Sequence, residues 1–83
     1  RFNLMKVRIN IVLKSNVLDP QGQAVANSLL GQGFNNIKNV RQGKILDIEF
    51  NSKEVDITMI NEMCEGFLTN PLVEDYSIEE INI

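Results

Sequence analysis

The residues best suited to chemistry are two cations on either side of a glycine, in the motif Arg41-Gln42-Gly43-Lys44. Two positive charges beside a position without a side chain could hold a phosphate or carboxylate, because glycine lets a ligand or a second backbone approach closely. The spacing is too short for a nucleotide-binding P-loop. A solvated turn or a bulged strand explains the same residues. Arg41, Gly43 and Lys44 are therefore candidates for an interface or an anion-binding site.

A catalytic centre is not predicted within this chain. Its 83 residues include no histidine, which removes the usual general base and the commonest metal ligand. Cys64 is the only thiol and is followed by Glu65, whereas a nucleophilic cysteine needs a base or an electropositive setting. The acidic pairs Glu74-Asp75 and Glu79-Glu80 lack the spacing of a calcium loop. We expect no catalytic residue, no metal site, no cofactor bound by this chain, and a buried structural Cys64.

Composition indicates one small globular domain. The chain has a mass of 9.4 kDa, with 43% hydrophobic and 23% charged residues. Residues 5–83 form the predicted domain, and residues 1–4, which precede Met5, are interpreted as a remnant of expression or processing. A single cysteine excludes an internal disulfide and fits the reducing cytoplasm.

Charge is distributed unevenly along the chain. The net charge is −3, yet all eight basic residues precede Glu54, and the segment from Glu54 onward carries eight acids and no base. Pairing of the two halves within the fold is the favoured interpretation, and steering of a polar partner is the alternative. The acidic balance argues against a nucleic-acid partner, and no apolar run approaches the roughly 18 residues of a membrane span.

A strand and a helix are predicted before the cationic motif. Residues 6–14 alternate between apolar and mostly polar side chains, which predicts a half-buried strand. Asp19 is a good N-cap, and Pro20 suits the first helical position. Gly33 is the expected left-handed C-cap of this helix. Two i,i+4 pairs on the helix, Val25 with Leu29 and Ala26 with Leu30, are expected to face the core.

A second strand, a second helix and a third strand follow. Residues 37–50 predict one long bent strand, with a hairpin pivoting at Gly43 as the alternative. Asn51 is the expected N-cap of the second helix, with Glu54 as its capping-box partner. Apolar residues recur at helical spacing through 59–68, and Asn70-Pro71 ends the helix. The last strand is predicted within residues 72–83.

The order β-α-β-α-β predicts an α+β two-layer sandwich related to the ferredoxin-like plan. An antiparallel sheet with a long bent or split middle strand would be covered by two helices. Four apolar residues fall outside the clear core registers and suggest association through the sheet, unless the sheet wraps enough to cover them. These residues are Val12, Ile45, Ile81 and Ile83.

Several sequence blocks, in order, resemble the PurS family, the small subunit of phosphoribosylformylglycinamidine synthase (formylglycinamide ribonucleotide amidotransferase). The resemblance covers nearly all of residues 5–80. Asp19, Pro20, Asn70 and Pro71 match the family, although their chemistry indicates capping and turn formation. The matching blocks are Lys6-Val7 through Leu18-Asp19-Pro20-Gln21-Gly22, then Gly33-Phe34, Val40-Arg41-Gln42-Gly43-Lys44, Met63-Cys64-Glu65 and Asn70-Pro71-Leu72-Val73-Glu74-Asp75-Tyr76.

The resemblance implies a place in purine biosynthesis. The holoenzyme of this family makes formylglycinamidine ribonucleotide from formylglycinamide ribonucleotide, glutamine and ATP. A large ligase subunit would use ATP and magnesium, and a glutaminase subunit would release ammonia. The small subunit is implied to be a cytoplasmic, non-catalytic homodimer or higher oligomer that bridges these two partners and supports ammonia transfer. No nucleic acid and no membrane is implied as a partner.

Two residues depart from the family pattern. Gln42 stands where an aliphatic residue is usual, which would make a subunit contact there weaker or more polar. Gly66 replaces a long helix-forming residue, at a cost of about 0.5–1 kcal/mol of helix stability relative to alanine. A different class of function stays open: a ferredoxin-like regulatory module that binds a nucleotide or another anion near Gly43 or the Asp19 helix start. An RNA-binding sheet is disfavoured, because only Phe50 and Tyr76 could stack on bases.

Overall fold

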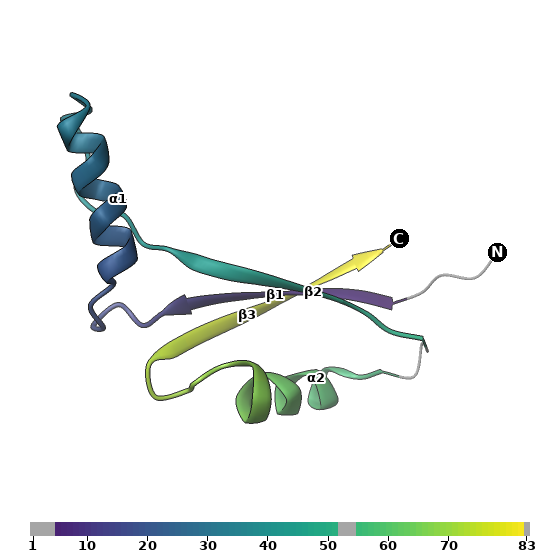
Figure 1. The fold of residues 1–83 in the computed structure, drawn as a ribbon. Helices are drawn as coiled ribbons and strands as arrows, with labels where there is room; N and C mark the ends of the chain where they lie inside the picture. Colours follow the sequence, from purple (N-terminus) through teal and green to yellow (C-terminus); the bar gives the residue numbers. More distant parts are fainter. Residues whose placement is uncertain (1–4, 52–54, 83) are drawn as a thin grey trace.

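The computed structural model describes residues 5–51 and 55–82 and has the predicted α+β character (Figure 1). The two helices and three strands follow one another in the order β-α-β-α-β, with a π-helical turn, η1, after the second helix. Residues 1–4, Glu54 and Ile83 lie outside the described part, so the predictions made for them stay predictions. The elements are β1 (Met5–Leu13), α1 (Pro20–Gly31), β2 (Gly43–Glu49), α2 (Ile57–Met63), η1 (Cys64–Leu68) and β3 (Glu74–Asn82).

The sheet has three strands in the order β2-β1-β3, and both pairings are antiparallel. Ile9 on the central strand lies opposite Leu46 on β2 and Ile78 on β3. Residues directly opposite in an antiparallel pair place their side chains on the same face. The alternation predicted for residues 6–14 is therefore confirmed, with apolar side chains on one face and mostly polar side chains on the other.

One face of the sheet is covered by α2 and η1, which lie below it in Figure 1. The buried cluster joins Val7, Ile9 and Ile11 of β1 to Ile60 and Cys64. Each of these five side chains is at most 1% exposed. Helix α2 is held to the sheet by this apolar contact, because burying such side chains stabilises the fold by roughly 1.5–3 kcal/mol each.

Helix α1 does not cover the sheet. It stands beyond one end of the strands in Figure 1, so the expectation of a sheet covered by two helices is wrong for this helix. Only Gly22 and Ala26 of α1 are buried, whereas Val25 and Leu30 are more than 40% exposed. The predicted inward pairs are therefore wrong for these two residues, because the core face of the sheet is already occupied by α2 and η1.

The C-terminal end of α1 follows the sequence prediction. Gly33 has a positive φ of 97°. Its N–H donates to the carbonyl of Leu30, and the N–H of Phe34 donates to the carbonyl of Leu29, both at 3.1 Å. These two bonds form the Schellman arrangement, which satisfies the last helical carbonyls and requires a left-handed residue.

The middle strand is shorter than predicted. It begins at Gly43, so neither the long bent strand nor the hairpin over residues 37–50 is present. Gly43 pairs with Val12, next to the last residue of β1. The residues before Gly43 have no further β1 partner, and the N–H of Gln42 donates to Asp19 instead.

The second helix begins later than predicted. Its N-cap is Asp56 and not Asn51, because the Asp56 carboxylate accepts the N–H of Met59 at 2.9 Å. After Met63 the chain widens into the π-helical turn, which changes the angular spacing of the side chains that follow. As a result Phe67, expected on the apolar face, is 87% exposed.

Candidate functional site

The cationic motif lies at one end of the sheet, where β1 ends, β2 begins and the first turn of α1 comes close. A shallow hollow of about 390 Å³ opens there. Asp19, Gln42, Lys44 and Glu74 line it together with residues at the end of β1. The hollow therefore holds one cation and two carboxylates, which does not favour a purely anionic ligand.

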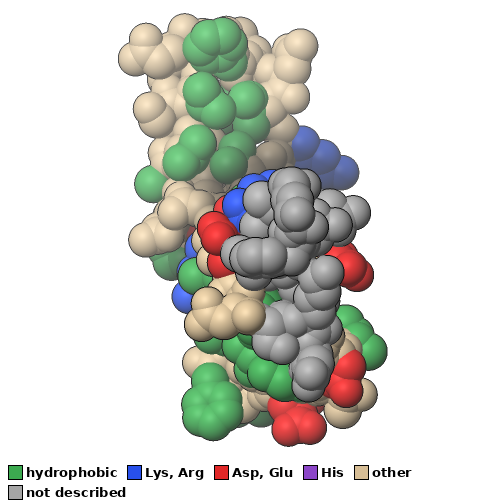
Figure 2. All heavy atoms as spheres, turned by 90° about the vertical axis from the view of Figure 1, so that its right-hand side faces the viewer, with side chains coloured by type: hydrophobic (Ala, Val, Ile, Leu, Met, Phe, Trp, Pro, Cys, Tyr) green, Lys and Arg blue, Asp and Glu red, His purple; other side chains and the backbone are tan. Residues whose placement is uncertain are grey.

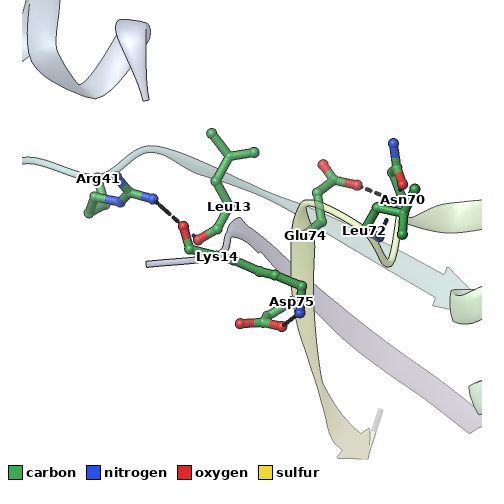
Figure 3. Close-up of polar contacts among 7 residues, drawn as sticks. All are labelled: Leu13, Lys14, Arg41, Asn70, Leu72, Glu74 and Asp75. Atoms are coloured by element: carbon green, nitrogen blue, oxygen red, sulfur yellow. Dashed lines mark hydrogen bonds and ion pairs between the residues drawn. The ribbon is translucent and has the colours of Figure 1, made fainter. Parts of the chain in front are cut away.

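Arg41 contacts the backbone of the same chain. Its Nη2 donates to the carbonyl oxygen of Lys14 at 2.8 Å and, at 3.4 Å, to that of Leu13 (Figure 3). Both carbonyls lie where β1 ends. The guanidinium thus ties the segment before β2 to the end of β1, while the residue stays exposed.

Lys44 lies on β2 directly opposite Ile11. Its Nζ is 4.0 Å from a carboxylate oxygen of Glu74, and its side chain is 59% exposed. Because the Lys44 ammonium is open to solvent and the separation is long, this pair contributes little to stability. The two cations of the motif therefore point to different partners, Arg41 to backbone carbonyls and Lys44 to Glu74, and do not converge on one ligand.

Gly43 is required by a close approach of the chain's own backbone. A Cβ at this position would lie 2.5 Å from the carbonyl oxygen of Ile11 and 2.7 Å from Cγ1 of Val12. Both distances are shorter than van der Waals contact. The predicted close backbone approach is confirmed, and the approaching backbone is that of β1.

Asp19 is the buried polar residue of this region, with 6% of its surface exposed. One carboxylate oxygen accepts the N–H of Gly22 at 2.9 Å, as an N-cap does, and the other accepts the N–H of Gln42 at 2.7 Å. The bond from Gln42, then that from Gly22, holds the pKa of Asp19 below its ordinary value. The N-cap and Pro20 at the first helical position are confirmed.

The bond between Asp19 and Gln42 was missed by sequence reasoning. The two residues are 23 positions apart, and the donor is a backbone N–H. No side-chain type at position 42 signals such a contact. The place of Asp19 before a helix predicts an N-cap, and an N-cap needs no partner outside its own helix.

Asn70 and Pro71 form the predicted turn between η1 and β3. The backbone N–H of Asn70 donates to Glu74 at 2.7 Å, and its side-chain oxygen accepts the N–H of Leu72 at 3.2 Å (Figure 3). The N–H groups of Val73 and Glu74 also donate to the carbonyl of Asn70. The last strand therefore starts at Glu74 and not at Leu72, as the sequence had suggested.

A polar cluster joins β3 to α2 and η1. The hydroxyl of Tyr76 lies 2.8 Å from Oδ1 of Asn61 and 2.9 Å from Oε2 of Glu65. The bond to Glu65 raises the pKa of Tyr76 above its ordinary value. Cys64 is fully buried next to this cluster, and burial raises the pKa of its thiol, as expected for a structural cysteine.

The outer face of the sheet carries charge pairs and apolar side chains. Arg8 pairs with Asp47 at 2.8 Å, and Lys14 pairs with Asp75 at 2.7 Å (Figure 3). The second pair joins the basic and acidic halves, as the favoured interpretation predicts. Val12 and Ile45 remain 45% and 57% exposed.

Exposed apolar side chains also follow α1. Figure 2 shows hydrophobic side chains gathered on the upper, more distant part of the molecule, where α1 lies. Of the residues on α1, Val25 and Leu30 are exposed, and Phe34 just beyond the helix is 59% exposed. Within residues 5–51 and 55–82, no cluster of three or more side chains is arranged to hold a metal ion, and no helix is long and apolar enough to span a membrane.

Comparison with known proteins shows to which family the chain belongs. The family model described as "PurS: Phosphoribosylformylglycinamidine (FGAM) synthase" matches residues 6–82. The chain belongs to the PurS family. The curated PurS subunit of Bacillus subtilis strain 168 is 40% identical over 78 residues, which are 92% of each chain. The PurS subunit of Methanocaldococcus jannaschii is 37% identical over 78 residues, 92% of this chain and 94% of the relative.

Solved PurS structures share this fold. A crystal structure of Bacillus subtilis PurS is 37% identical, with a TM-score of 0.83 over 93% of this chain and 98% of that one. A chain in the structure of PurLQS from Thermotoga maritima is 34% identical, with a TM-score of 0.76 over 94% and 98%. The resemblance found in the sequence blocks and the predicted α+β class are both confirmed.

Proposed function

We propose that the chain is the small, non-catalytic assembly subunit of phosphoribosylformylglycinamidine synthase in purine biosynthesis. The observation that carries this proposal is the PurS family match over residues 6–82, together with the likeness to a chain of PurLQS. In this role the chain bridges the ATP-dependent ligase subunit and the glutaminase subunit in the cytoplasm. ATP and magnesium are used by the ligase subunit, and this chain binds no cofactor.

The chemistry of the side chains supports a non-catalytic role. The sequence has no histidine to activate a nucleophile, and its single thiol at Cys64 is fully buried with a raised pKa. Glutamine hydrolysis by a cysteine and a histidine therefore belongs to another subunit. What this chain supplies is a shaped surface that can align partners and keep water away from ammonia in transit.

We further propose that the chain works as a homodimer or higher oligomer. The Cα atoms extend 51 × 31 × 14 Å. The smallest of these extents, 14 Å, is the thickness of one sheet with one helical layer. The second face of the sheet carries exposed Val12 and Ile45. A second copy covering this face would bury both side chains, and Arg8 and Asp47 on the same face would enter the interface already paired with each other.

Lys44 is the stronger candidate for a contact with a partner subunit. It is well exposed and only loosely paired with Glu74. Arg41 supports such a contact indirectly, because it holds the segment beside Lys44 against β1. A polar group of a partner could therefore bind Lys44 at this end of the sheet without rearranging it.

The test is reconstitution from purified components with each one omitted in turn. We expect this chain to co-purify with the ligase and glutaminase subunits, to lack glutamine or ATP turnover alone, and to be required for glutamine-dependent synthesis. Full glutamine-dependent synthesis by the two larger subunits without this chain would contradict the proposal. Turnover of glutamine or ATP by the isolated chain would contradict its non-catalytic part.

A further inference from the structure

Asp19 does more than a helix cap requires. A cap needs one side-chain oxygen to accept an N–H of the first turn. Here Oδ1 accepts the N–H of Gly22, while Oδ2 accepts the N–H of Gln42 from the segment that leads into β2. One buried carboxylate therefore joins the start of α1 to a segment more than 20 residues further along the chain.

Further contacts hold the first turn of α1 against the segment that leads into β2. A Cβ on Gly22 would lie 2.2 Å from the carbonyl oxygen of Val40, so the first turn of α1 rests directly on that segment. The side chains of Gln21 and Gln42 are joined by a hydrogen bond of 2.8 Å. Arg41 in turn fastens the segment to the end of β1 through the carbonyl of Lys14.

The rest of α1 buries few side chains. Beyond the first turn Ala26 is its one buried residue, Leu29 is half-buried, and Val25 and Leu30 are exposed. A helix of 12 residues is about 18 Å long, so a tilt of about 10° at its base moves its far end by about 3 Å. Contacts at the base therefore decide where the exposed apolar side of the helix is presented.

We propose that Asp19 is a positioning residue, whose second oxygen locks the direction in which α1 leaves the sheet and so presents α1 for assembly. The part concerning assembly rests on the proposed function. The locking itself depends only on the bonds from Gly22 and Gln42. Substitutions that keep the cap but remove the bridge should therefore free the helix without unfolding it.

The chain offers a matched control in Asp56. It is also an aspartate N-cap, but it is exposed and accepts an N–H from Met59 of its own helix. Helix α2 is held by the buried Ile60, so its direction does not depend on its cap. Serine at either position keeps good capping with a single oxygen. Asp19→Ser and Asp56→Ser therefore make the same chemical change, and only the first removes a bridge.

Electron paramagnetic resonance can measure the direction of α1. Spin labels are placed at the exposed positions Ser28 on α1 and Thr58 on α2 as cysteine variants, and Cys64 is too buried to be labelled. Labelled chain is diluted into unlabelled chain so that distances within one copy dominate. Circular dichroism follows helix content, and the reconstituted synthase assay follows assembly.

For Asp19→Ser we expect a clearly broader distance distribution, unchanged helix content and a roughly tenfold weaker apparent affinity for the partner subunits, about 1.4 kcal/mol. Asp56→Ser should leave the distance distribution and the affinity unchanged. Gly22→Ala keeps Asp19 and should still shift the distance, because its Cβ displaces the Val40 segment.

An unchanged distance distribution in both Asp19→Ser and Gly22→Ala would overturn the lock. Equal broadening in Asp56→Ser would also overturn it, because general loosening would then explain the effect. A broadened distance with unchanged affinity would overturn the link to assembly. The distance measurement does not depend on the partners, so failure of the proposed function would appear separately, as a wild-type chain that the synthase does not need.

Discussion

Replacing Gly43 by alanine tests the packing at the start of β2. The added Cβ would meet the Ile11 carbonyl oxygen at 2.5 Å and Cγ1 of Val12 at 2.7 Å. The valine side chain can rotate, but the carbonyl belongs to the central strand and cannot move alone. The first residues of β2 must therefore separate from β1 at the Val12–Gly43 pair.

The expected loss of stability is about 2 kcal/mol. Forcing a methyl group into packed structure costs about 1–3 kcal/mol, and a weakened ladder hydrogen bond costs about 1 kcal/mol. Reduced freedom of the unfolded chain offsets about 0.4–1 kcal/mol. With an m-value of about 1 kcal/mol/M for a small protein in urea, the unfolding midpoint should fall by about 2 M.

The assay is urea unfolding of the isolated chain, followed by circular dichroism at one fixed protein concentration, because association shifts apparent stability. Gly31→Ala is the control: its Cβ would meet nothing within 4 Å, and its residue is helical. That variant should gain about 0.5–1 kcal/mol. A Gly43→Ala midpoint equal to that of the wild type would refute the close approach. Unchanged stability with lost synthase activity would instead indicate that Gly43 makes room for a ligand or partner.

The cationic motif, the Asp19 carboxylate and the glycine of the π-helical turn can each be tested by substitution. The double variant Arg41→Ala/Lys44→Ala should weaken complex formation and glutamine-dependent synthesis, while Arg41→Ala alone should cost the isolated chain about 1 kcal/mol through its lost bonds to the β1 carbonyls. Wild-type complex formation and synthesis in the double variant would show that the motif is no contact site. Hydrogen bonds lower the pKa of Asp19 in the folded chain, so its carboxylate stabilises the fold at neutral pH, and that contribution is lost as the pH falls through the folded pKa. Urea midpoints of wild type and Asp19→Asn should therefore converge below about pH 4, and a gap that stays constant with pH would contradict this linkage. Gly66→Ala should raise the midpoint by about 0.5–1 M, because its Cβ meets nothing within 4 Å, and a lowered midpoint would show that the π-helical turn needs glycine there.

Sequence patterns correctly predicted the features that depend only on residues close together in the chain. The alternation of residues 6–14 predicted the central strand, since a strand with one buried face needs a period of two. Asp19 and Gly33 predicted the two ends of α1, because caps satisfy backbone groups of their own helix. The same reasoning predicted Asn51 as the cap of the second helix, whereas the structure has Asp56, because both residue types are good caps and the start of this helix depends on where the chain leaves the sheet.

The sequence predicted which residues form the candidate site, but it did not predict which partners they contact. Gly43 was expected at a close approach, and the structure shows that β1 makes it. Arg41 and Lys44 were expected to act together, whereas one binds backbone carbonyls and the other lies near Glu74. Side-chain type gives the charge of a residue, but its partner depends on which strands are neighbours.

The sequence alone determined the α+β class, the PurS family, the lack of a histidine-based catalytic pair and the apolar face of the central strand. The class, the missing histidine and the apolar face follow from composition, order and periodicity, and the family follows from the resemblance of the sequence blocks. None of these needs knowledge of distant neighbours. The three-dimensional fold was needed to show that α1 leaves the sheet, that β2 starts at Gly43 and that Asp19 bridges to Gln42. These features depend on parts of the chain that are distant in sequence. Helix α2 and η1 fill the core face, and the pairing of β1 with β2 ends at Val12 and Gly43. The backbone N–H of Gln42, which has no strand partner, therefore binds the buried carboxylate of Asp19.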